Sequence, residues 1–176
     1  ETGIIPQDEL RYLIEERKAQ TQTYYNYRYD ICGTGDLSWL FASNKFDTVV
    51  HLASFPRQKV VQQNPRRGSH VMNDGLINLL ELSRDHGTTK FVYVSSSMVY
   101  GDFSDTVKED AVCRPVSLYG IFKYAGELIT QEYSRRFGIA HTIVRPSAVY
   151  GPRDVVDRVV AKFMLSALRN QPLIVR

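Results

Sequence analysis

The sequence predicts an α/β protein built on a doubly wound parallel sheet, and two observations lead to this prediction. Three short runs rich in β-branched residues are continuously apolar, as in strands buried on both faces: residues 46–53, 90–97 and 140–151. Longer segments with helical spacing of apolar residues separate these runs. Strand–helix–strand connections of this length are right-handed crossovers, so we expect the strands to lie parallel in one sheet.

The first half of the chain adds one further strand and two helical segments to this scheme. Residues 25–33 (YNYRYDICG) alternate in polarity and are predicted to form a strand near a sheet edge. Residues 36–44 are predicted to form a short helix with Asp36 as its N-cap. Residues 57–86 are predicted to be helical, with Pro65 as a kink or restart. Their apolar residues recur at helical spacing: Val60, Val61, Val71, Leu76, Leu79 and Leu80.

The second half continues the alternation of strands and helices. A strand at 90–97 (KFVYVSSS) is followed by a predicted helix over 117–137, which ends at Gly138. The strand at 140–151 (AHTIVRPSAVYG) closes with Pro and Gly, and an amphipathic helix follows over 154–169. The helix over 117–137 has an apolar stripe made of Leu118, Ile121, Ala125, Leu128 and Ile129.

Length and composition indicate a single domain of an ordinary globular protein. The chain has 176 residues, and its formal net charge of +3 is too small to favour nucleic acid or a membrane as a partner. No apolar run approaches a membrane span, and nothing resembles a signal peptide. The two cysteines, Cys32 and Cys113, have no metal-ligand spacing, so we expect no metal site. Free thiols indicate a reducing compartment, which predicts a cytoplasmic protein.

The strand ends are the places to search for a ligand site, because doubly wound sheets bind ligands beyond the carboxyl ends of their strands. Small residues at these ends, as in HLASFP and RPSAVYGP, let a flat ligand approach the backbone closely. Ser95, Ser96 and Ser97 add hydroxyl groups at a third strand end. The alternative is that these serines only begin a loop.

Tyr119 and Lys123 are one helical turn apart, so they share a face of the predicted helix. A nearby ammonium group favours the phenolate, so the pKa of Tyr119 is expected to fall two or three units below ~10. That change would suit general acid–base catalysis near neutral pH. A solvent-facing pair without chemistry is the alternative, and the serines at the preceding strand end favour the catalytic interpretation.

Four segments in this order resemble the extended short-chain dehydrogenase/reductase superfamily: FDTVVHLAS, FVYVSSSMVYG, SLYGIFKYAGE and IVRPSAVYGPR. More narrowly, they resemble its NAD-dependent nucleotide-sugar epimerase/dehydratase family, which implies a Rossmann-like fold. The resemblance implies Ser96, Tyr119 and Lys123 as catalytic residues, and Ser96, Ser97 and Tyr119 as substrate-binding residues. It also implies NAD as cofactor, contacted by Asp30, Ile31, Leu52, Ala53, Ser54, Tyr119, Lys123, Pro146 and Ser147.

One departure from the family pattern concerns the cofactor. The glycine-rich GxxGxxG turn does not occur, and Gly33-Thr-Gly35 lacks a third glycine at the required offset. We therefore expect residues 1–176 to be a partial NAD-binding domain, without the glycine-rich segment and most of the C-terminal substrate-binding region. Such a fragment is expected to bind NAD weakly or not at all, and to be inactive by itself.

The resemblance implies an isomerase of carbohydrate metabolism, and we expect a nucleotide-sugar epimerase acting at C4 through a keto-sugar intermediate. Ser97 and Met98 stand where the family's dehydratases carry an acidic pair, which argues against a 4,6-dehydratase. A dehydratase, decarboxylase or reductase of the same superfamily remains an alternative, as does a non-catalytic Rossmann-like binding protein. Family members commonly dimerise through helices that correspond to residues 57–86 and 117–137, so a homodimer is expected.

Overall fold

The computed structural model describes residues 25, 27–55, 58–103, 106–151 and 159–174. The chain divides into two compact units, residues 28–147 and residues 1–27 together with 148–176. The first unit contains every strand that the structure describes and every predicted site residue. The second contains helix α7 (Val159–Leu168), which lies within the predicted helix over 154–169; positions 154–158 lie outside the described residues.

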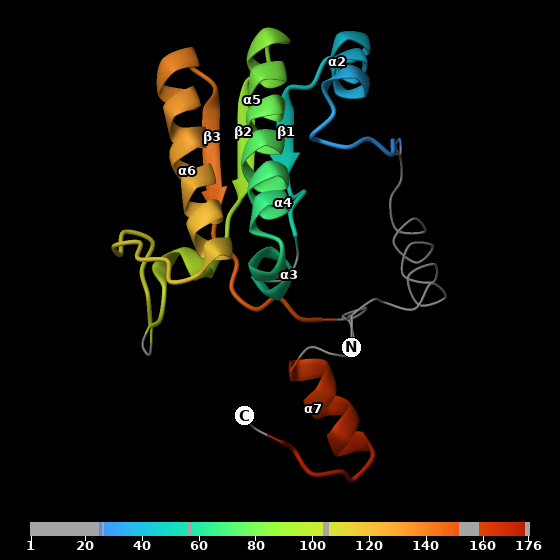
Figure 1. Ribbon diagram of the computed structural model, residues 1–176, viewed down its shortest axis with the longest axis vertical. Coiled ribbons are helices and arrows are strands. Elements are labelled where there is room, and N and C mark those ends of the chain that lie inside the picture. The colour runs from blue at the N-terminus through green and yellow to red at the C-terminus, as the bar shows by residue number, and fades with distance from the viewer. Residues whose placement is uncertain (1–24, 26, 56–57, 104–105, 152–158, 175–176) are drawn as a thin grey trace. The chain divides into compact units, whose positions relative to one another are not determined.

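A three-stranded parallel sheet is the centre of the first unit, which confirms the predicted fold class. Its strands are β1 (Thr48–His51), β2 (Lys90–Val94) and β3 (Ala140–Val144), in the order β1-β2-β3 (Figure 1). Their register places Thr48 opposite Lys90 and Lys90 opposite Ala140. Each strand is shorter than predicted, because most of the residues that follow it belong to the loops at the sheet edge.

The strands are not buried on both faces, contrary to the prediction. Phe91 and Tyr93 of β2 are fully buried on one face, which α5 (Gly75–Asp85) and α6 (Leu118–Phe137) cover (Figure 1). Val50 and Val144 of the outer strands are 52% and 42% exposed. Continuous apolar runs therefore overstated the burial of the strands within residues 28–147.

The predicted strand at 25–33 is absent from the described residues of this range, so that prediction is wrong. Asp30 instead forms a turn: its Oδ1 accepts from the Cys32 amide at 2.9 Å, and its carbonyl accepts from the Gly33 amide at 3.0 Å. Helix α2 (Thr34–Ser43) begins directly after this turn, with Gly33 as its N-cap. Asp36 is thus not the N-cap, but it lies in the first turn, where the negative charge of a carboxylate interacts favourably with the helix dipole.

The helical segment predicted at 57–86 forms four successive pieces. Pro65 begins a new helix, which confirms the predicted restart. The pieces are α3 (Gln58–Gln63), α4 (Pro65–Ser69), a π-helical turn η1 (His70–Asp74) and α5. Buried side chains of these pieces build the core: Val61, Met72, Leu76, Leu79 and Leu80. The π-helical turn has no counterpart in the sequence prediction.

Helix α6 begins and ends where the sequence predicts. The hydroxyl of Ser117 accepts from the Gly120 amide at 3.2 Å, and Gly138 ends the helix with a φ of +74°. The buried face, however, is not the predicted apolar stripe, since Ile121 and Leu128 are exposed. Small and polar residues face the sheet instead: Gly120, Lys123, Gly126, Glu127 and Thr130.

Close packing of α6 on β2 depends on Gly126, because a Cβ at this position would collide with the Tyr93 hydroxyl. Gly126→Ala is therefore expected to destabilise the protein by about 1–3 kcal/mol, as overpacked core variants do. The free energy of unfolding, measured by urea denaturation, checks this expectation. Gly35→Ala in α2 is the matched control, because nothing lies within 4 Å of a Cβ there; it should be neutral or stabilise the helix by up to about 1 kcal/mol. Equal midpoints for Gly126→Ala and the unaltered protein would contradict the packing argument.

Candidate active site

The carboxyl end of β2 and the first turns of α6 lie against each other. The ammonium of Lys123 donates to the carbonyl of Val94, the last residue of β2, at 2.7 Å. A Cβ on Gly120 would collide with the carbonyl of Met98, which shows how closely the helix approaches the turn after the strand. This packing brings Tyr119 and Lys123 to the strand end that carries the three serines.

The three serines after β2 have different partners. Ser95 continues the ladder by donating its amide to the Val144 carbonyl at 2.7 Å, and its hydroxyl donates to Glu127 Oε1 at 2.5 Å. Ser96 is buried, and its hydroxyl accepts from the Met98 amide at 3.2 Å as the cap of a 3₁₀ turn, η2 (Ser97–Tyr100). A hydroxyl that accepts one hydrogen bond can still donate its proton, so Ser96 retains a donor for a ligand.

Lys123 is unusually buried for a lysine, since only 4% of its surface is exposed. Its ammonium lies 5.3 Å from the Tyr93 ring centroid and 6.0 Å from the Tyr119 ring centroid. Burial lowers the pKa of Lys123 to about 8. The group therefore carries its positive charge at neutral pH and loses it on mild alkalinisation.

The lowered pKa predicts a pH-dependent contribution to stability. Between pH 8 and 10.5 the unfolded chain keeps the Lys123 proton and the folded protein releases it, so stability rises with pH in this window. The gain should reach up to about 3 kcal/mol, and it should disappear in Lys123→Met. Urea denaturation of both proteins from pH 7 to 10 measures the difference. Parallel stability curves would show that Lys123 keeps an ordinary pKa.

Tyr119 and Tyr93 both lie near Lys123, but they differ as candidate acid–base groups. Tyr119 is half-buried in the first turn of α6, on the same helix face as Lys123. Tyr93 is fully buried; burial, then the charge of Glu127, raises the pKa of Tyr93 far above its usual value. A phenolate at Tyr93 is therefore strongly disfavoured, which leaves Tyr119 as the candidate at this position.

The other residues predicted to contact a cofactor lie at three further places in the same unit. Leu52 and Ala53 are exposed directly after β1, and Ser54 is half-buried with its hydroxyl 3.5 Å from the Phe55 carbonyl. Asp30 is exposed in its turn, while the Ile31 side chain packs on Gly75 and its carbonyl accepts from Asn78. Beyond the end of β3, the Pro146 carbonyl accepts from the Ser97 amide at 3.0 Å, which joins Pro146 and Ser147 to the serine turn, residues 95–100.

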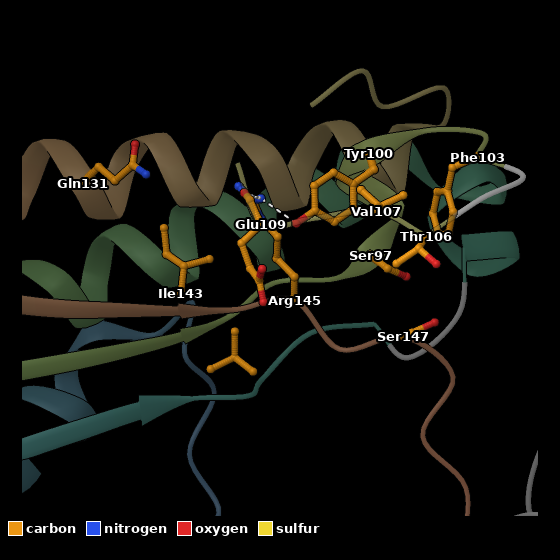
Figure 2. A pocket seen from close by; sticks show the side chains of 11 residues that line it. Ser97, Tyr100, Phe103, Thr106, Val107, Glu109, Gln131, Ile143, Arg145 and Ser147 are labelled. Carbon is orange, nitrogen blue, oxygen red and sulfur yellow. Dashed lines mark hydrogen bonds between the residues drawn. The ribbon is translucent and has the colours of Figure 1, made fainter. Parts of the chain in front are cut away.

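A pocket of about 680 Å³ opens beside these strand ends and continues along β3 (Figure 2). Two of the predicted residues, Ser97 and Ser147, line it, whereas Ser96, Tyr119 and Lys123 do not. Its other lining residues come from the turn and loop after β2, from α6 and from β3: Tyr100, Phe103, Thr106, Val107, Glu109, Gln131, Ile143, Val144 and Arg145.

Sequence reasoning missed a buried ion pair and a buried histidine beside the site. Glu127 is 0% exposed and binds Arg145 through both oxygens, at 2.9 and 2.7 Å. His51 is buried against the Tyr93 ring, and burial and the charge of Lys123 lower its pKa to about 4, so it is neutral. Glu127 follows Lys123 by four residues, a spacing that usually indicates a solvent-exposed helix pair.

Within the described ranges, there is no group of three or more His, Cys, Asp or Glu side chains that could hold a metal ion. In the same part of the chain, none of the helices has the length and apolar character needed to cross a membrane.

Comparisons with known proteins give the chain a family context. The model of the NAD dependent epimerase/dehydratase family matches residues 8–176. UDP-glucuronate 4-epimerase 1 of Arabidopsis thaliana is 35% identical over 143 residues, which are 78% of this chain and 33% of that protein. The dTDP-D-glucose 4,6-dehydratase of Mus musculus is 30% identical over 157 residues, which are 89% of this chain and 44% of that protein.

A solved structure with the same fold is the UDP-glucuronic acid 4-epimerase from Bacillus cereus in complex with UDP-glucuronic acid and NAD. It superposes with a TM-score of 0.80 at 30% identity, covering 96% of this chain and 52% of that one. The chain spans about half the length of the relatives it matches, or less. The similarity confirms a Rossmann-type α/β fold for the matched part.

Proposed function

The chain belongs to the NAD-dependent epimerase/dehydratase family, and from this membership we propose that the protein is a nucleotide-sugar epimerase acting at C4. One observation carries the catalytic assignment: Lys123 is buried one helical turn from Tyr119 and donates to the strand that leads into Ser96. The named relatives add support, since two of the three are 4-epimerases of UDP-glucuronate.

Each of the three catalytic residues has a role that its environment supports. Tyr119, as a phenolate, accepts the proton of the sugar C4 hydroxyl and later returns it. Lys123 stabilises the phenolate by its charge, which burial makes more effective because the local dielectric constant is low. Ser96 donates its hydroxyl proton to the sugar oxygen that becomes the ketone, and its own oxygen is fixed by the Met98 amide.

The described residues fit two parts of NAD, which supplies a hydride acceptor and donor when bound. In the proposal, the buried ammonium of Lys123 binds the nicotinamide ribose, and Pro146 and Ser147 contact the nicotinamide. The Asp30 carboxylate, which accepts one hydrogen bond from Cys32, has capacity left for a donor on the adenine of NAD. The remaining contacts in the proposal come from Ile31, Leu52, Ala53, Ser54 and Tyr119. A glycine-rich turn for the pyrophosphate does not occur in the sequence.

The proposal extends to the substrate. We propose that Ser96, Ser97 and Tyr119 contact the sugar of a nucleotide sugar, with Ser97 reaching it from the pocket wall. Ser97 and Met98 provide no acid, and elimination of water requires a proton donor to the departing hydroxyl. This difference favours an epimerase, while the similarity to a 4,6-dehydratase keeps that activity as the second candidate.

Assembly and location belong to the proposal as well. The exposed Ile121 and Leu128 on α6 would be covered in a homodimer formed through α6 and the helices of residues 58–85. The two free cysteines, Cys32 and Cys113, are consistent with a reducing compartment, so we place the protein in the cytoplasm.

The activity is tested by incubating the full-length protein and NAD with UDP-glucose, UDP-glucuronic acid and dTDP-glucose, and separating the products. Conversion to the C4 epimer of one of these sugars is the expected result. Formation of a 4-keto-6-deoxy sugar would show that the protein is a 4,6-dehydratase and not an epimerase. Unchanged substrates, together with intact folding, would support the non-catalytic alternative.

A further inference from the structure

Arg145 connects three separate segments around the candidate site. It lies directly after β3, and its largely buried guanidinium binds Glu127 on α6. Its Nη1 donates to the hydroxyl of Tyr100 at 2.8 Å (Figure 2) and to the backbone carbonyl of Glu109 at 2.9 Å. The guanidinium carbon also lies 4.9 Å from the Tyr100 ring centroid, so ring and charge are in contact.

These contacts fix the backbone on both sides of Ser96. Before it, Ser95 donates its hydroxyl to Glu127, the carboxylate that binds Arg145. After it, the 3₁₀ turn ends at Tyr100, whose hydroxyl accepts from Arg145. We call the side chains of Ser95, Tyr100, Glu127 and Arg145 the Arg145 network. This network contacts both ends of the serine turn.

The same network reaches the helix that carries the other two catalytic candidates. Glu127 follows Lys123 by one turn on the buried face of α6, and Lys123 follows Tyr119 by one turn. Arg145 thus joins α6 and the Ser96 turn through a single rigid, planar group. These hydrogen bonds link the turn that carries Ser96 to the helix that carries Tyr119 and Lys123.

Stability alone is a poor explanation for such a network. A buried ion pair loses its hydration on folding, and well-packed apolar residues are often equally stable in its place. Geometry is a better explanation, since displacement of a reacting group by about 1 Å can lower a rate by about 100-fold. We propose that Tyr100, Glu127 and Arg145 are positioning residues that hold Ser96 in the correct position relative to Tyr119 and Lys123, a role that rests on the proposed function.

A pair of matched variants tests this role on the full-length protein with UDP-glucuronic acid and UDP-glucose. Tyr100→Phe removes the hydroxyl that binds Arg145 and keeps the ring beside Phe103. Tyr133→Phe removes a hydroxyl on α6 that donates to Glu81, away from the serine turn. We expect similar small losses in the urea midpoint for both. Only Tyr100→Phe should lower kcat, by about tenfold, with KM unchanged within about twofold.

A second measurement reports on Ser96 without any need for activity. The Met98 amide donates to the Ser96 hydroxyl, so its hydrogen exchange follows the order of the turn. Exchange at Met98 should become about tenfold faster in Tyr100→Phe and stay unchanged in Tyr133→Phe.

The combined outcomes separate the network from the proposed function. If the protein has no nucleotide-sugar activity but Met98 still exchanges faster in Tyr100→Phe, the proposed function is refuted. The Arg145 network is then still the element that orders Ser96. In an active enzyme, unchanged kcat in Tyr100→Phe would overturn the positioning role, whatever the exchange shows. Equal losses of kcat in both variants would also overturn it, because they would reflect general destabilisation.

Discussion

Replacement of Tyr119 by Phe is expected to lower kcat of the full-length enzyme by two to four orders of magnitude, with little change in KM. The substitution removes the phenol oxygen that we propose as the acid–base group, and it keeps the aromatic ring in the first turn of α6. General acid–base catalysis by a positioned side chain contributes about 10²- to 10⁴-fold, which sets the size of the loss. Steady-state kinetics with the substrate identified in the product assay provides the measurement.

Tyr124→Phe is the matched control for this prediction. Tyr124 lies on the same helix, five residues after Tyr119, which turns its side chain by roughly 140° around the helix axis. It should therefore keep nearly full activity. If Tyr119→Phe kept more than about half of the normal kcat, Tyr119 would not be the acid–base group. The proposed role of Lys123 would then fail as well.

Local signals explain why the sequence predicted α6, and the place of Tyr119 and Lys123 on it, correctly. The cap at Ser117 and the left-handed Gly138 depend on residues within one turn of each helix end. The shared face of Tyr119 and Lys123 follows from the helical period alone. Such features require no knowledge of the rest of the fold, so their prediction from sequence is dependable.

Features that depend on distant partners were missed or predicted wrongly. Residues 25–33 alternate like a strand, but a strand also needs a neighbour in the sheet, and the described residues of this range have none. Lys123 and Glu127 look like a solvated helix face, yet both are buried, because their partners come from elsewhere in the chain. Lys123 binds the Val94 carbonyl and Glu127 binds Arg145, each over a long sequence separation.

The largest effect on stability is expected from Arg145→Met. The substitution leaves the Glu127 carboxylate fully buried without its positive partner, since both oxygens bind the guanidinium. Breaking a buried pair in this way costs about 3–5 kcal/mol, a large part of the 5–15 kcal/mol that stabilises a typical domain. Urea denaturation at neutral pH should show this loss in the free energy of unfolding.

Arg135→Met is the control that isolates burial as the cause. Arg135 also binds a glutamate of α6, Glu132, but the two side chains are 73% and 47% exposed. Water screens that pair, so its loss should cost less than about 1 kcal/mol. Adding Glu127→Leu to Arg145→Met should recover much of the stability, because no buried charge then lacks a partner. If Arg145→Met and Arg135→Met were equally destabilising, Glu127 would have to be hydrated in solution, and the Arg145 network could not hold the serine turn in place.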